Sequence, residues 1–213
     1  RGFPKVVSVA NPPTFDDKES GRRQLADWLT RPDHPLTARV FVNRIWSKLF
    51  GAGIVPTVDD FGDQGQKPTH PELLDFLAWQ FVDQSWSVKK TVRELVLSRT
   101  YQLGSAADAN NLAKDETNVS LWRFSRRRLD AEVIRDSTLA ASGQLDVTRP
   151  VASTVTGLRL RELGPDTNFA PVQKPSRHRS VYLPIVRHKS PEALAIFDLP
   201  DPSLVIGTRE AST

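Results

Sequence analysis

Residues 38–49 constrain the fold more than any other part of the chain. Six apolar residues recur there at i, i+3, i+4, i+7, i+8 and i+11: Ala38, Phe41, Val42, Ile45, Trp46 and Leu49. This spacing predicts an α-helix with a wide apolar stripe that must be covered by another element. Gly51 follows directly and suits a left-handed residue that ends the helix.

A second helix is predicted after a loop that contains Gly53, Pro56, Gly62 and Gly65. Thr69 and Glu72 have the spacing of a capping box, in which each side chain accepts a hydrogen bond from the other residue's amide. The apolar residues that follow recur at helical spacing: Leu73, Leu74, Leu77, Ala78, Phe81 and Val82. The two helices therefore offer each other a partner face.

Shorter helices are predicted around this pair. Residues 22–30 form one, Ser87 is expected to cap another, and residues 129–145 form a third. Residues 104–118 are rich in Ala, Asp and Asn without periodicity and predict a flexible loop. After about residue 147, Pro, Thr and Val dominate, and we expect an extended segment over 180–186 and a last short helix through Phe197.

These patterns predict a mainly α fold, a bundle of five or six helices with a Pro-rich, partly extended C-terminal layer. We expect residues 1–20 to form an N-terminal arm and residues 21–146 the helical core. Residues 147–213 are then a layer of the same domain that wraps the bundle.

Composition excludes several kinds of site. The chain has no cysteine, which rules out disulfides, Cys-type zinc sites and covalent haem attachment in this chain. The four histidines lack metal-ligand spacing, so no metal site is predicted. No apolar run reaches the roughly 18 residues of a transmembrane helix. A net charge of +4, with acids interspersed almost throughout, does not favour nucleic-acid binding.

Asp59, Asp60 and His70 are the strongest polar candidates for a site. Both carboxylates lie in the loop between the two main helices and His70 lies at its end. Adjacent carboxylates could act as an acid–base pair or bind a hard cation such as Ca²⁺. The alternative, which we favour, is turn chemistry: one carboxylate caps a turn, the other faces solvent, and His70 begins a helix.

Asn43 and Arg44 are candidate binding residues beside the apolar stripe. Arg44 could clamp a ligand carboxylate in bidentate fashion. The alternative, which we favour, is a structural ion pair with Asp59 or Asp60.

The remaining candidates are aromatic and basic. Trp86 and Trp122 lie beside loops and could stack on sugars, whereas Trp28 and Trp46 fit the core. The basic run of Arg126, Arg127 and Arg128 could meet phosphate, a sulfated glycan or an acidic domain. Alternatively, these arginines lie in solvent at the start of a helix, where some of them pair with nearby acidic residues.

The ordered motifs resemble a known family. Residues 38–46 read ARVFVNRIW, followed by FGAG at 50–53, DDFG at 59–62 and HPELLD at 70–75. Later blocks are RTY at 99–101, RRRLDAE at 126–132, IRD at 134–136 and SVYL at 180–183. Together they resemble the C-terminal "PSD" domain, of unknown function, of large cytochrome-bearing planctomycete proteins. Similar proteins continue past a residue like Thr213, so the resemblance implies a larger domain.

The resemblance also implies a context. Such domains occur in exported proteins, downstream of a cytochrome-c-like domain and a second domain of unknown function. We therefore expect a periplasmic or envelope location, haem on another domain, and a link to redox or polysaccharide chemistry. Other domains of the same polypeptide, and glycans, are the expected partners.

Two functions remain open. The first, which we favour, is a non-catalytic interaction module of an exported multidomain protein. The second is part of a hydrolytic or metal-assisted enzyme site built on Asp59, Asp60 and His70, with Asn43 and Arg44 nearby.

Overall fold

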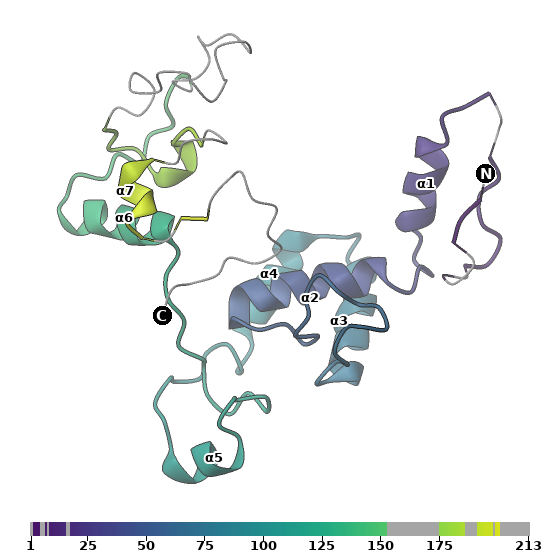
Figure 1. Ribbon diagram of the computed structural model, residues 1–213, viewed down its shortest axis with the longest axis horizontal. Coiled ribbons are helices and arrows are strands. Elements are labelled where there is room, and N and C mark those ends of the chain that lie inside the picture. The colour runs from purple at the N-terminus through teal and green to yellow at the C-terminus, as the bar shows by residue number, and fades with distance from the viewer. Residues whose placement is uncertain are drawn as a thin grey trace. The chain divides into compact units, whose positions relative to one another are not determined.

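The computed structural model describes residues 2–4, 7, 9–15, 18–152, 175–185, 191–197 and 199–200. Within these residues it has seven α-helices and the 3-10 helix η2, and no strand, so the prediction of a mainly α fold is confirmed (Figure 1). Contacts divide the chain into two compact units, residues 1–126 and 127–213. The expected boundary at 146/147 and the wrapping layer stay predictions.

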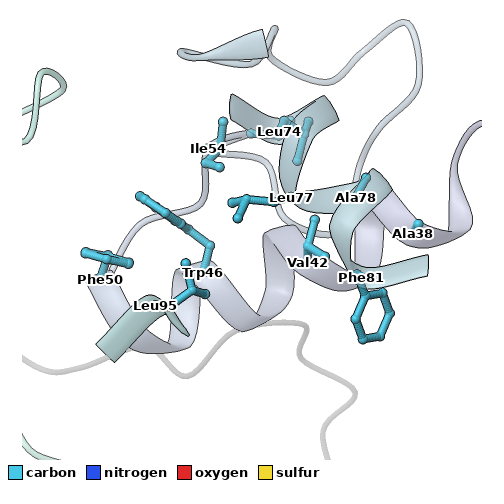
Figure 2. Packing of buried hydrophobic residues seen from close by; sticks show 11 residues of the cluster. Ala38, Val42, Trp46, Phe50, Ile54, Leu74, Leu77, Ala78, Phe81 and Leu95 are labelled. Atoms are coloured by element: carbon cyan, nitrogen blue, oxygen red, sulfur yellow. The ribbon is translucent and has the colours of Figure 1, made fainter. Parts of the chain in front are cut away.

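The core of the first unit lies between helices α2 (Thr37–Phe50), α3 (Pro71–Asp83) and α4 (Val88–Leu97). Figure 2 shows side chains from all three helices, and Ile54 from the loop after α2, gathered in this core. Val42 and Trp46 supply the α2 side, and Leu77 and Phe81 the α3 side. The two predicted apolar stripes therefore cover each other, and burial of such side chains contributes about 1.5–3 kcal/mol each.

The ends of these helices test the capping predictions. Gly51 ends α2 with φ 92°, and the Ser87 hydroxyl accepts a hydrogen bond from the Lys90 amide at the start of α4, as predicted. The capping box at Thr69 is wrong, because α3 begins after His70 without a side-chain cap. Thr69 instead donates from both its amide and its hydroxyl to the carbonyl of Ile54, at 2.8 and 3.1 Å. Ile54 is buried, so its carbonyl needs a hydrogen-bond partner within the protein. Thr69 supplies this partner and does not cap α3.

Helix α1 (Arg22–Leu29) packs against the described part of the N-terminal arm. The Phe3 ring stacks on Trp28 and lies against Phe15, with ring centroids 4.9 and 4.8 Å apart. Arg31 donates to the backbone carbonyls of Ala10 and Asn11. The predicted arm is therefore attached to α1 by an aromatic cluster and by two hydrogen bonds.

His34 supports the start of α2. Its Nδ1 atom accepts hydrogen bonds from the amides of Leu36 and Thr37, at 3.3 and 3.2 Å. The ring is buried edge-on against Trp28, 4.5 Å between centroids. A histidine thus satisfies two amides that a helix start leaves without intrahelical partners.

Three sequence predictions need correction. Residues 104–118 contain the short helix α5 (Ala109–Lys114), because Asp108 accepts a hydrogen bond from the Asn111 amide and caps it. Helix α6 (Ala131–Ala141) is shorter than residues 129–145, since Ser142 and the left-handed Gly143 end it. Where an extended segment was expected, η2 (Ser180–Tyr182) forms instead; residue 186 lies outside the described residues.

The last predicted helix is present as α7 (Glu192–Ala195), followed by a turn at residues 196–197. It packs against α6 together with η2. Within the described part of the chain, no helix has the length and apolar character needed to cross a bilayer.

Candidate functional site

Asn43 is wholly buried and ties α2 to the loop that follows it. Its amide nitrogen donates to the Val55 carbonyl at 3.0 Å, and its amide oxygen accepts from the Val55 amide at 2.9 Å. A Cβ on Gly53 would lie 2.3 Å from the Val55 carbonyl oxygen, so only glycine fits beside this contact. Asn43, a candidate binding residue in the sequence, is thus engaged with the backbone of Val55.

Arg44 forms the predicted ion pair with Asp59. The Nη2–Oδ1 distance is 3.2 Å, and both side chains remain exposed. An exposed pair of this kind contributes roughly 0–1 kcal/mol to stability. The pair joins α2 to the loop at the surface, one residue along the helix from the buried Asn43 contact.

Asp60 and His70 have different local partners. The Asp60 carboxylate accepts from the Gly62 amide at 2.9 Å and closes a turn, the structural alternative foreseen for this pair. His70 Nδ1 lies 3.0 Å from the Thr69 hydroxyl, whose proton goes to Ile54. In the residues that the structure describes, no group of three His, Asp or Glu side chains is arranged to hold a metal ion.

Trp122 belongs to a tightly hydrogen-bonded loop after α5. Its indole N–H donates to the Asp115 carbonyl at 3.0 Å, and the Arg123 guanidinium lies over its ring, 4.7 Å from the centroid. The Asp115 carboxylate accepts from the amides of Ser120 and Val119, which lowers the pKa of this carboxyl. Arg123 thus covers one face of the Trp122 ring, which is a candidate platform for sugar stacking.

The other aromatic and basic candidates are placed individually. Trp86 packs edge-on against Phe81, 5.3 Å between centroids, and is partly buried against the core. Trp28 and Trp46 are buried, as predicted. The run of Arg126, Arg127 and Arg128 is exposed.

The second unit contains a network that sequence reasoning missed. Arg135 on α6 donates to the carbonyls of Ser176 and His178 and to the Ser180 hydroxyl. Asp136 accepts from the amide and the hydroxyl of Ser180, at 2.8 and 2.6 Å. The IRD and SVYL motifs are therefore partners, a contact between residues over 40 positions apart that no local pattern indicates.

Next to this network, Asp146 closes a turn. Its carboxylate accepts from the Thr148 hydroxyl and amide at 2.7 and 2.9 Å, and these bonds, with the nearby His178 ring, lower the pKa of Asp146. His178 Nδ1 is 3.2 Å from Asp146 Oδ2, close enough for an ion pair but without hydrogen-bond alignment.

The outer face of α3 carries a second feature that we did not anticipate. Phe76 and Trp79 are 52% and 64% exposed, with ring centroids 6.3 Å apart. The signal was present in the sequence, since both positions fall outside the predicted apolar stripe of this helix. Large aromatic side chains rarely gather at the surface without a partner.

The comparison with protein families identifies the chain. The family model PSD1, described as "Protein of unknown function (DUF1553)", matches residues 21–213. The chain belongs to the PSD1 family. Residues 1–20 lie outside the matched part. Neither the curated proteins nor the solved structures include a match to this PSD1 chain.

Proposed function

We propose that this PSD1 chain is a non-catalytic interaction module of an exported multidomain envelope protein linked to redox or polysaccharide processing. The observation that supports it best is the exposed pair Phe76 and Trp79 on α3. Aromatic residues are enriched at protein interfaces because they bury a large area with few rotatable bonds. The binding face is therefore the outer side of α3, and its partner is another domain of the same polypeptide.

The placement of the polar candidates also supports a structural scaffold. Asn43 is wholly buried, Asp60 closes its own turn, and Asp59 is paired with Arg44. Each of these side chains has a local structural role that stabilises the connection between α2 and α3. The envelope location and the haem on a neighbouring domain rest on the resemblance to cytochrome-bearing planctomycete proteins.

Hydroxyl-radical footprinting of the full-length polypeptide and of this 213-residue chain tests the proposal. We expect oxidation of Phe76 and Trp79 to fall in the full-length protein, because another domain covers them. Leu97 on α4, which is 60% exposed, is the matched control and should react equally in both. Equal labelling of Trp79 in both proteins contradicts an interaction through this face.

A thermal-shift screen addresses the enzyme alternative. The chain is heated with divalent cations and with neutral and sulfated glycans, each tested also on the variant Asp60→Ala. A ligand at 100 times its Kd stabilises a protein by about 2.7 kcal/mol, which shifts Tm by several degrees. A shift that is lost in Asp60→Ala would favour a site on the Asp59–Asp60 loop over a non-catalytic module.

A further inference from the structure

Four residues form one stripe along the outside of α3: Glu72, Phe76, Trp79 and Asp83, here called the α3 stripe. Their spacing of four, three and four residues places them on one face of the helix. Leu74, Leu77 and Phe81 point into the core from the opposite face. All four stripe residues are exposed. With a rise of 1.5 Å per residue, the stripe is about 16 Å long.

The ends of the α3 stripe are negatively charged. Glu72 precedes the two aromatic rings and Asp83 follows them. Asp75 lies beside the stripe and forms an ion pair with Arg39 of α2 at 2.5 Å. The hydrogen bond from Arg39 lowers the pKa of Asp75, and the positive charge of Arg39 offsets part of the negative charge of this carboxylate. The chain as a whole carries +4, so this face is opposite in sign to the net charge. An aromatic centre between two carboxylates favours a partner with apolar and cationic groups.

The aromatic rings strengthen this preference. The face of a Trp or Phe ring attracts Lys and Arg side chains electrostatically, in addition to burying apolar area. Polyanionic partners such as sulfated glycans or nucleic acids would be repelled by Glu72 and Asp83. A neutral glycan could stack on the rings but would leave both carboxylates without an ionic partner.

We propose that the α3 stripe binds a protein segment in which Lys or Arg residues flank an apolar side chain. The inference rests on the proposed function, since it names the chemistry of the partner that this face recognises. The apolar side chain of the segment packs against the exposed surfaces of Phe76 and Trp79. Its cationic residues lie against Glu72 and Asp83, spaced to match the length of the stripe.

A random peptide library displayed on phage is the probe. It is selected on the immobilised wild-type chain, and no variant is used to remove clones beforehand. Selected peptides are then synthesised and titrated by fluorescence anisotropy against the wild type and the variants. Glu72→Gln/Asp83→Asn removes the two charges, and Asp27→Asn/Asp63→Asn is the matched control, because these acids are exposed outside α3. Leu97→Ala controls for exposed apolar area, and circular dichroism verifies the fold of each variant.

We expect the selected peptides to be enriched in Lys and Arg around an aliphatic or aromatic residue. Trp79→Ala should weaken binding roughly thirty-fold or more, as for a central interface residue. Glu72→Gln/Asp83→Asn should weaken it about two- to thirty-fold, with a weaker salt dependence. Both control variants should bind as the wild type does.

Other results would overturn the inference in distinguishable ways. One such result is a set of peptides that require Trp79 but lack basic residues, or that bind Glu72→Gln/Asp83→Asn as tightly as the wild type. This result excludes the proposed partner chemistry and leaves the interaction module intact. Failure to recover any Trp79-dependent peptide contradicts the proposed segment, whereas the interaction module is contradicted by equal labelling of Trp79 in the footprinting experiment. Concentration-dependent dimerisation lost in Trp79→Ala assigns the stripe to a second copy of the chain instead.

Discussion

Asn43 joins α2 to the next loop through both polar atoms of its amide. Its partners are the amide and the carbonyl of Val55, which is buried. Water therefore cannot readily replace Asn43 as their hydrogen-bond partner. A primary amide offers one donor and one acceptor in the geometry that a backbone amide requires. This explains why asparagine, and no carboxylate, occupies the position.

Replacing Asn43 by alanine should therefore destabilise the first unit strongly. Two buried backbone groups lose their partners at about 1–3 kcal/mol each, so we expect a loss of roughly 2–6 kcal/mol in urea unfolding. Arg44→Ala is the neighbouring control and removes only an exposed ion pair, which costs about 1 kcal/mol or less. Similar losses for the two variants would show that the Asn43 contact is not formed in solution.

His34 gives the start of α2 a dependence on pH. Burial lowers the pKa of His34, against a smaller opposing effect of Asp33, and protonation of Nδ1 would abolish the bonds from Leu36 and Thr37. A histidine whose pKa is lowered by folding contributes its full stabilisation above the unfolded value of about 6.5. This contribution is lost as the pH falls from there through the folded pKa.

We expect the free energy of unfolding to fall between about pH 6.5 and pH 5, before most carboxylates titrate. In His34→Asn the side-chain oxygen can accept from the same amides without titrating in this range. The variant should therefore show a flatter profile in urea unfolding measured at half-unit pH steps. An unchanged slope would assign the acid sensitivity to another group.

At the scale of elements, the connection between α2 and α3 depends on close packing of backbone. Gly53→Ala would bring a Cβ within 2.9 Å of the Asn43 amide nitrogen as well as into the Val55 carbonyl. We expect a loss of about 1–3 kcal/mol from this overpacking. Gly104→Ala is the control, because nothing lies within 4 Å of its added Cβ, and it should unfold as the wild type does.

The pairing of α6 with η2 predicts a local effect in the second unit. Arg135→Lys keeps the charge, but its ammonium is a single compact group and cannot reach the acceptors that the two guanidinium nitrogens of Arg135 serve from separate positions. Hydrogen exchange of the Ser180 amide, which donates to Asp136, should become faster, while amides within α2 stay unchanged. Arg126→Lys at an exposed position is the control. Unchanged protection of Ser180 would show that Asp136 alone holds this segment.

At the scale of the whole molecule, the hydrophobic core that the described residues of α2, α3 and α4 form lies within the first unit. The buried residues of this core and the partly buried ones packed on them fall between residues 38 and 124. A fragment of residues 1–126 should therefore unfold cooperatively on its own, as followed by circular dichroism during heating. A gradual, non-cooperative melt would mean that residues after 126 are needed for this core to form.

Local signals in the sequence determined the elements of this core. The i, i+3, i+4 pattern of α2, the glycine at its end and the serine before α4 act over a few residues, and they form as predicted. The predicted Arg44–Asp59 pair bridges only 15 positions along the chain. Periodicity and capping are local properties, which is why they can be read from one sequence.

Only the tertiary structure decided the fate of individual polar residues. Asn43 is buried because the backbone of Val55 approaches α2 there, and Thr69 turns to Ile54 because that carbonyl lacks another partner. The network of Arg135, Asp136 and Ser180 likewise joins distant segments. Sequence spacing thus determined the helices that form the core of the first unit and the faces that they bury. The tertiary structure decides which polar groups contact each other and leaves Phe76 and Trp79 exposed, because both outcomes depend on which distant segments pack together.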